Sequence, residues 1–411
     1  MPPKAKANKS VYQMAPPIPS GHIITDFTKR SWSVGKAFAQ GGFGAIYSVS
    51  NGANDTASKA SKYVLKIEPK NNGPLFVEIN FYQRAAKQHD IDEFKLARKL
   101  DYLGVPAFVA AGCFEFQKSQ FRFLIMPRFG SDVQKKLEMF KSFPATTVFQ
   151  MAKCLINCLE YIHHKDFTHS DIKGANVLLS DSFPNQIYLA DFGLAFRYAP
   201  DGVHKPYKAD PRRAHDGTIE YTSRDAHAGA TPSRRSDLEI LGYVLLHWSS
   251  GTLPWLDKLD NKEYVAKAKE KFMNAIPSLV STCFNKRQPR VADTLKTYLK
   301  LISDYSYLQQ PDYDKLRAVF HRNFPIEMNA PLQFSSSESP TTPITKRKKN
   351  LLIKADAPER QQVLNPCRKS PRLIIHSPQI EEKEASVQTS PWLYEKFRED
   401  RRMRRRLAKQ Q

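Results

Sequence analysis

Apolar residues recur at three- and four-residue spacing in segment 74–88, PLFVEINFYQRAAKQ. The segment begins with proline, a favourable first residue of a helix. Four apolar side chains then share one face: Leu75, Ile79, Tyr82 and Ala86. The rest of the first hundred residues is strand-rich, so we expect a mostly β-sheet lobe with this one clear helix.

Two longer helical patterns follow. Residues 146–164 place five apolar side chains on one face, namely Val148, Met151, Leu155, Leu159 and Ile162. Residues 236–251 are apolar nearly all round, which is typical of a helix buried in a core. Together the patterns predict an α+β fold of two lobes, a β-rich N-lobe followed by a helical C-lobe.

Changes of composition mark the ends of the folded part. Residues 1–20 are basic and contain several prolines, and SSSESPTTPITKRKKN, beginning at residue 335, turns abruptly to Ser, Pro and Lys. We expect a disordered basic N-terminus, a folded domain of two lobes and a disordered Ser/Pro- and Lys/Arg-rich tail, with the bounds 1–20, 21–325 (lobes of about 21–130 and 131–325) and 326–411.

The net charge of +22 favours an anionic partner, either nucleic acid or an acidic protein surface. The alternative is that the charge serves solubility in disordered tails. No run of about 18 apolar residues occurs, so we expect no membrane-spanning helix. The five cysteines are scattered, which indicates a reducing compartment, and the pair Cys154 and Cys158 is interpreted as core packing rather than as a metal site.

A glycine-containing stretch, FAQGGFGAIY, is the first candidate for ligand chemistry. Glycines between two apolar ends suit a strand–turn–strand whose backbone amides approach phosphates, because a side chain would hold the backbone away. Ala39 stands where a full G-x-G-x-x-G pattern has its first glycine, and we expect altered nucleotide affinity rather than loss of binding. The residues assigned to the ATP contact are Phe38, Ala39, Gln40, Gly41, Gly42, Phe43, Gly44, Ala45 and Ile46.

The stretch YVLKIE alternates as a strand and carries Lys66 between apolar neighbours. Twelve residues later, Glu78 lies on the apolar face of the helix in 74–88, where a carboxylate without a partner is costly. We expect Glu78 to pair with Lys66 and to hold the lysine over the α- and β-phosphates of ATP. The alternative is a lysine on a solvent-facing strand position.

The stretch FTHSDIKGANVLL follows the second helix and has the spacing of a phosphoryl-transfer loop. Asp171 would accept or orient the proton of an attacking hydroxyl, and Lys173 would neutralise charge on the phosphoryl group. Asn176, and Asp191 at the start of a D-F-G, would offer oxygen ligands to Mg²⁺. D-x-K-x-x-N followed 15 residues later by D-F-G rarely arises by chance.

With these residues in place, the chain resembles a eukaryotic protein kinase. The stretches GTIEYTSRDAH and SRRSDLEILGYVLLHW are similar to the casein kinase one branch, and NGPLFVEINFYQRAA, PRFGSDVQKK and GTLPW resemble the vaccinia-related kinase family within it. The resemblance covers about residues 22–325. It implies a serine/threonine kinase that uses ATP and Mg²⁺, with Thr218 contacting Asp171 and Lys173.

The resemblance also implies a hinge in FLIMPRFGSD that binds adenine. Met126 would guard the back of the pocket, the carbonyl group of Pro127 would accept a hydrogen bond, and the amide of Phe129 would donate one. Ser170 replaces the arginine that usually pairs with a phosphate on the activation segment. Because the family resembled also lacks this arginine, we expect activity without activation-segment phosphorylation.

The tail carries two basic runs, KRKK at 346–349 and RRMRRR at 401–406. The first resembles a nuclear import signal, and the second is suited to DNA or to an acidic histone surface on a nucleosome. Solvated charge is the alternative for both. Five residues that precede proline are weak candidates for phosphorylation: Ser339, Thr342, Ser370, Ser377 and Ser390.

We therefore expect a monomeric ATP-dependent serine/threonine kinase of nuclear, chromatin-associated proteins such as histones, with a cytoplasmic pool left open. Two alternatives remain. The chain is a nucleotide-binding pseudokinase that scaffolds partners, since one member type of the family is a pseudokinase, or it is a chromatin-binding protein whose basic tail matters more than catalysis. Turnover that depends on Asp171 and Asp191 would distinguish an active kinase from the pseudokinase. Removal of 396–411 with the kinase domain retained would test the chromatin-binding alternative.

Overall fold

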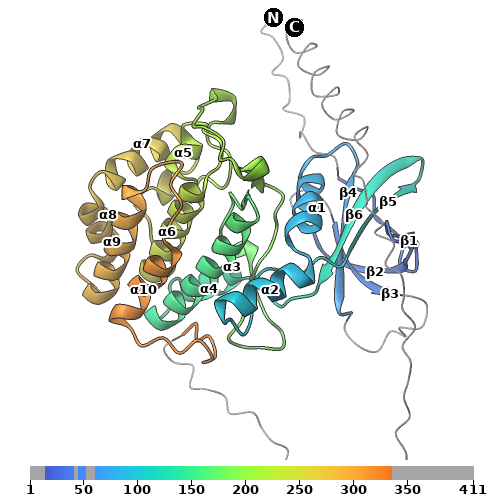
Figure 1. The fold of residues 1–411 in the computed structure, drawn as a ribbon, viewed down its shortest axis with the longest axis horizontal. Helices are drawn as coiled ribbons and strands as arrows, with labels where there is room; N and C mark the ends of the chain where they lie inside the picture. Colours follow the sequence, from blue (N-terminus) through green and yellow to red (C-terminus); the bar gives the residue numbers. More distant parts are fainter. Residues whose placement is uncertain (1–13, 41–44, 52–60, 336–411) are drawn as a thin grey trace, which may run out of the picture. The chain divides into compact units, whose positions relative to one another are not determined.

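The computed structural model describes residues 14–40, 45–51 and 61–335, which form a β-rich lobe followed by a helical lobe (Figure 1). The small lobe is built on a six-stranded antiparallel sheet in the order β1-β2-β3-β4-β6-β5. The strands are β1 (Ile23–Thr25), β2 (Ser31–Gln40), β3 (Ala45–Asn51), β4 (Tyr63–Pro69), β5 (Ala110–Phe116) and β6 (Ser119–Pro127). The predicted two-lobed α+β architecture is therefore confirmed.

Helix α1 (Pro74–Ala85) lies beside the sheet and faces the large lobe (Figure 1). Its first residue is the predicted proline, and the four side chains of its expected apolar face are all buried: Leu75, Ile79, Tyr82 and Ala86. Alternation along the strands places Trp32, Val34, Tyr47, Val49, Leu65 and Ile67 in a separate core of the small lobe.

The large lobe is assembled around two buried helices, α4 (Ala145–His164) and α6 (Arg234–Ser250). Helix α6 begins with a reciprocal capping box between Ser233 and Ser236 and ends at Gly251, whose φ of 80° is readily adopted only by glycine. Around them lie α3 (Val133–Phe140), α5 (Arg224–His227), α7 (Lys262–Met273), α8 (Ile276–Phe284), α9 (Pro289–Asp304) and α10 (Tyr313–Asn323).

Short strands of the large lobe carry the loops that face the small lobe. They are β7 (Phe167–Thr168), β8 (Val177–Leu179), β9 (Ile187–Leu189) and β10 (Phe196–Arg197). Strand β7 pairs with β10, and β8 pairs with β9. These two small two-stranded sheets place the loop before β8 and the loop after β9 next to each other. Among the described residues, no helix is both long and apolar enough to cross a membrane.

A second helix in the first hundred residues, α2 (Gln88–Arg98), corrects the expectation of one helix there. Ile91 is its one buried residue, so its sequence lacks the apolar stripe that reveals an amphipathic helix. The ring of Phe94 meets Tyr161 of α4 edge-on at 5.2 Å, and polar contacts also join the helix to α4 and to the residue after it. Lys165 donates a 2.9 Å hydrogen bond to Asp90, and Arg98 pairs with Glu160.

The domain boundaries at residues 20 and 325 also need correction. Ile18 is buried, and its amide donates to the hydroxyl group of Tyr47 at 3.0 Å. Beyond residue 325, Phe334 is buried, and the hydroxyl of Thr147 on α4 donates to the carbonyl of Gln333. The large lobe therefore continues to residue 335 as an irregular segment, which helical periodicity does not reveal. Predictions for 336–411, including both basic runs, lie outside the described residues.

Candidate active site

The hairpin of β2 and β3 lies beside β4, the strand that carries Lys66. Across it, Ala39 pairs with Ile46 and Gln40 with Ala45, and Ile46 pairs in turn with Lys66 on β4. The turn itself lies outside the described residues, namely Gly41, Gly42, Phe43 and Gly44. The ring of Phe38 is largely exposed and lies 5.2 Å from the guanidinium group of Arg128.

Lys66 lies between two carboxylates, one from each lobe. Its Nζ is 2.6 Å from Glu78 Oε2 on α1 and 3.1 Å from Asp191 Oδ1, which follows β9. Burial by itself would lower the pKa of Lys66, but Glu78 and then Asp191 outweigh it and raise that pKa above its usual value. Burial would raise the pKa of Asp191, and the Lys66 ammonium reverses this, leaving it below its usual value. The pair expected from sequence is present, and the two carboxylates favour the charged form of the lysine.

A column of rings joins α1 to the loop before β8. Phe192 is fully buried and stacks on Phe81 with 3.6 Å between centroids, while Tyr82 meets it edge-on at 5.6 Å. On the other side, His169 lies 4.8 Å from Phe192. Asp191 precedes this ring with a φ of 61°, a strained value for a non-glycine residue that is typical of functional sites. The column thus fixes the position of α1 relative to the loop.

Asp171, Lys173 and Thr218 form a closed polar triangle. The hydroxyl of Thr218 donates to Asp171 Oδ1 at 2.6 Å and accepts from Lys173 Nζ at 2.9 Å. Lys173 Nζ also lies 2.8 Å from Asp171 Oδ2. Thr218 comes 47 residues after Asp171 in the chain, so this contact depends on the tertiary fold.

Asn176 and Asp191 offer oxygen atoms at adjacent ends of two paired strands, because Asn176 immediately precedes β8 and Asp191 follows β9. The amide group of Asn176 donates to the carbonyl oxygen of Asp171 at 2.8 Å, which leaves its own side-chain oxygen available. The backbone amide of Ala190 donates to the carbonyl of Asn176 at 2.8 Å and ties the two positions together. Mg²⁺ is commonly held by one or two carboxylates together with phosphates and waters, so this donor set fits Mg²⁺.

The segment between the lobes contains the three residues predicted to contact adenine. Met126 is buried near the end of β6 and pairs with Val64. Pro127 closes the strand, and the ring of Phe129 stacks on Tyr188 with 4.2 Å between centroids. These residues therefore lie where the chain passes from the sheet to the large lobe.

Sequence reasoning missed Asp237, which anchors the loop that carries Asp171, called the catalytic loop below. This fully buried carboxylate on α6 accepts backbone hydrogen bonds from His169 and Ser170, both at 2.8 Å. It also accepts one at 2.9 Å from Nε2 of His163, and burial lowers the pKa of that histidine. A buried carboxylate on a core helix needs partners, and the argument made for Glu78 would also have identified Asp237.

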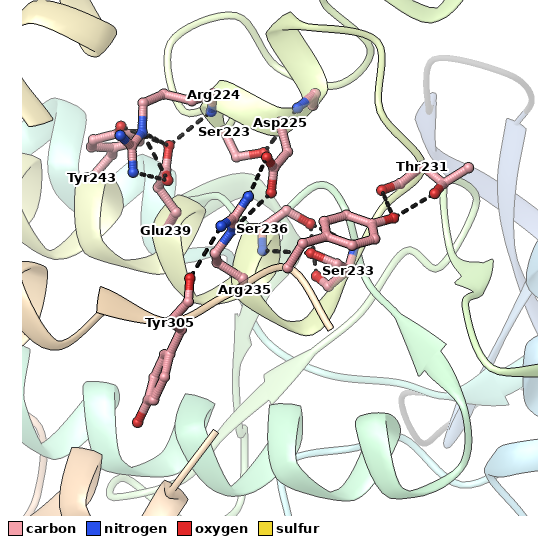
Figure 2. Close-up of polar contacts among 12 residues, drawn as sticks. Ser223, Arg224, Asp225, Thr231, Ser233, Arg235, Ser236, Glu239, Tyr243 and Tyr305 are labelled. Carbon is pink, nitrogen blue, oxygen red and sulfur yellow. Dashed lines mark hydrogen bonds and ion pairs between the residues drawn. The ribbon is translucent and has the colours of Figure 1, made fainter. Parts of the chain in front are cut away.

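Figure 2 shows a second group that sequence reasoning missed, which anchors α5 on α6. Arg224 forms an ion pair of 3.1 Å with Glu239, which also accepts a 2.9 Å hydrogen bond from the hydroxyl of Tyr243. Arg235 grips Asp225 through two nitrogens at 2.6 and 3.1 Å. The backbone that follows Thr218 is thus tied to the core of the large lobe.

Comparison with known proteins agrees with this geometry. The family model described as "Protein kinase domain" matches residues 32–310. The chain is 39% identical over 344 residues to human "Serine/threonine-protein kinase VRK2" and 41% identical over 320 residues to "Nucleosomal histone kinase 1" of Drosophila melanogaster. These matches cover 82% and 77% of this chain, and the chain spans 64% and 51% of the length of these two relatives.

A solved structure extends the comparison to the fold. The "Structure of vaccinia related kinase 3" superposes with a TM-score of 0.67 at 30% sequence identity, covering 78% of this chain and 96% of that one. The fold, the ion pair of Lys66 and the loop of Asp171 define a protein kinase domain. Within that class, the chain belongs to the vaccinia-related kinase family.

Proposed function

We propose that the chain is an ATP- and Mg²⁺-dependent serine/threonine protein kinase acting on nuclear, chromatin-associated proteins. The observation that carries the proposal is the triangle of Asp171, Lys173 and Thr218, assembled in one structure with the Lys66–Glu78 pair. Removal of a proton from the acceptor hydroxyl and stabilisation of charge on the phosphoryl group are the tasks of such a site.

Each residue has a task in this proposal. Asp171 orients the acceptor hydroxyl and receives its proton, while Lys173 stabilises negative charge on the phosphoryl group in transfer. Thr218 fixes the carboxylate of Asp171 and the ammonium of Lys173 in one orientation. Asn176 and Asp191 would hold Mg²⁺, which when bound neutralises phosphate charge, and Lys66 would contact the α- and β-phosphates.

Activity without activation-segment phosphorylation is part of the proposal. Ser170 cannot pair with a phosphate as the usual arginine does. Its amide is instead held by Asp237, and its hydroxyl lies 3.1 Å from that of Thr168. Internal contacts therefore support the loop in the place where other kinases use a phosphate.

The chromatin part of the proposal has two supports. One relative is named a nucleosomal histone kinase, and the chain carries a net charge of +22, which favours acidic surfaces and nucleic acid. The basic runs at 346–349 and 401–406 are proposed to direct nuclear import and to contact a nucleosome or DNA. The chain is proposed to act as a monomer.

The test is transfer of phosphate from ATP·Mg²⁺ to casein, free histones and assembled nucleosomes. Wild type, treated beforehand with a phosphatase that is then removed, is compared with Asp171→Asn. We expect transfer by the wild type and a loss of about 10²- to 10⁴-fold in kcat for the variant. Preference for nucleosomes over casein would support the chromatin assignment.

Three outcomes count against parts of the proposal. Absence of transfer by either protein, with ATP still bound, would favour the pseudokinase scaffold. An inert phosphatase-treated wild type that regains activity on phosphorylation would refute phosphorylation-independent activity. Equal use of casein and nucleosomes would remove the chromatin assignment and leave the kinase.

A further inference from the structure

Helix α7 carries a lysine on its buried face. Val265, Lys269 and Met273 are spaced four apart and point inward, and Lys269 is completely buried. Among the described residues, no ion pair to its ammonium is found. Burial lowers the pKa of Lys269 well below its usual value, although Glu239 and Glu220 act in the opposite direction. A lysine in such a position is costly unless its protons are hydrogen-bonded.

The hydrogen-bond partners of Lys269 among the described residues all lie in one segment, residues 217–227, which we call the acceptor segment. Lys269 Nζ donates to the carbonyl oxygens of Ile219 at 2.7 Å and Thr222 at 2.8 Å. Its third contact is Nε2 of His227 at 3.3 Å. The ammonium thus spans the turn between these residues and fixes it to α7.

The histidine contact leads back to the same helix. With Nε2 of His227 accepting from Lys269, its Nδ1–H donates to Nδ1 of His215 at 2.8 Å. His215 then donates from Nε2 to Glu263, at the start of α7, at 2.9 Å. Helix α7 therefore holds the acceptor segment from the inside through Lys269 and from the outside through Glu263.

A short path connects Lys269 to the catalytic carboxylate. The amide and the hydroxyl of Thr222 both donate to the carbonyl oxygen of Thr218 at 2.8 Å. The side chain of Thr218 donates in turn to Asp171 at 2.6 Å. Beyond this turn, the chain is anchored on α6 by Arg224 and Asp225 (Figure 2). Lys269 ties residues 218–222 of the acceptor segment to α7. The same turn is also held by Trp255, whose Nε1 donates to the carbonyl oxygen of Glu220 at 2.9 Å, and by His247 of α6, which lies 2.8 Å from the hydroxyl of Tyr221.

We propose that Lys269 is a positioning residue for the protein acceptor, which sets the place of Thr218 and so of the acceptor hydroxyl before Asp171. The inference rests on the proposed kinase function and concerns the protein substrate. Lys269 makes no contact with Lys66, Glu78 or Asp191. Its removal should therefore affect the protein substrate and leave nucleotide binding unchanged.

The test is Lys269→Met in the full chain, with Lys271→Met, an exposed lysine of the same helix, as the matched control. We expect kcat/KM for the protein acceptor to fall about 10- to 100-fold while KM for ATP stays within about twofold, because the acceptor geometry alone is disturbed. Lys269→Arg keeps donors for both carbonyl oxygens and should restore part of the loss. The control variant should behave as wild type.

A second readout does not require turnover. Peptide-level hydrogen exchange should rise in Lys269→Met over residues 218–222 and stay unchanged over β4. A wild type that transfers no phosphate would refute the proposed function, and the positioning role would then be judged by this exchange alone.

Several results would overturn the positioning role. These are wild-type acceptor kinetics in Lys269→Met, equal losses for acceptor and ATP, or no local rise in exchange. If Lys269→Met does not fold, the test passes to Lys269→Arg. This variant must then change KM for the protein acceptor and leave KM for ATP unchanged. Failure of both to fold would assign Lys269 to stability of the fold and refute the inference.

Discussion

Replacing Asp237 with asparagine should separate loop positioning from nucleotide binding. The carboxylate accepts three hydrogen bonds, from the amides of His169 and Ser170 and from the ring of His163. Asparagine keeps one oxygen and turns the other acceptor into a donor. At least one of the three N–H groups must then face another N–H group, and the others lose a charged acceptor.

The magnitude follows from these contacts. A hydrogen bond to a charged group contributes about 1.5–3 kcal/mol, and a buried donor left without an acceptor costs about 1–3 kcal/mol. We expect Asp237→Asn to lower the free energy of unfolding by about 3 kcal/mol, which corresponds to a fall in Tm of about 6 °C. Because His169 and Ser170 immediately precede Asp171, displacement of the loop should lower kcat about 100-fold. ATP affinity should hold, since Asp237 makes no contact with Lys66.

The assay combines thermal unfolding, ATP binding and phosphate transfer for wild type and variant. Asp293→Asn is the matched control. Asp293 is exposed, and within the part of the chain that the structure describes its carboxylate pairs only with Lys296, a contact worth less than about 1 kcal/mol. A variant that keeps wild-type kcat, or that loses ATP affinity and kcat in parallel, would refute the assignment of Asp237 to the catalytic loop.

Two further predictions concern pH and the domain boundary. Burial first, then Lys269 and His215, lowers the pKa of His227 to about 3. Below about pH 6.5, His227 therefore binds a proton in the unfolded chain but not in the folded chain. The free energy of unfolding falls as the pH is lowered, by about 2 kcal/mol at pH 5. Buried histidines such as His163 also contribute to the loss in both proteins. In urea unfolding at pH 7.5 and 5, the loss should therefore be about 2 kcal/mol smaller in His227→Gln than in wild type, and equal losses would contradict the prediction. A chain ending at residue 325 lacks Phe334, whose ring is buried edge-on against Phe143, and should be about 3 kcal/mol less stable than one ending at 335; equal melting temperatures would restore the shorter boundary.

Local periodicity and spacing determined much of this protein. The buried faces of α1 and α4 follow from side chains spaced three and four apart, and they match the predicted residues. The pairing of Lys66 with Glu78 was also predictable, because a carboxylate on an apolar helix face requires a partner. The motif around Asp171 indicated its chemistry, since a few residue types at fixed spacing suffice for phosphoryl transfer.

The tertiary structure alone decided which distant groups meet. Helix α2 has too few buried side chains to produce a pattern, and the segment 326–335 has no periodicity at all. Lys269 appears in the sequence as one lysine among several on a charged helix, and only the fold places it beneath the turn of Ile219 and Thr222. The physical reason is that periodicity records which side of an element is buried, whereas the partner of a buried polar group is set by elements that fold against it from elsewhere in the chain.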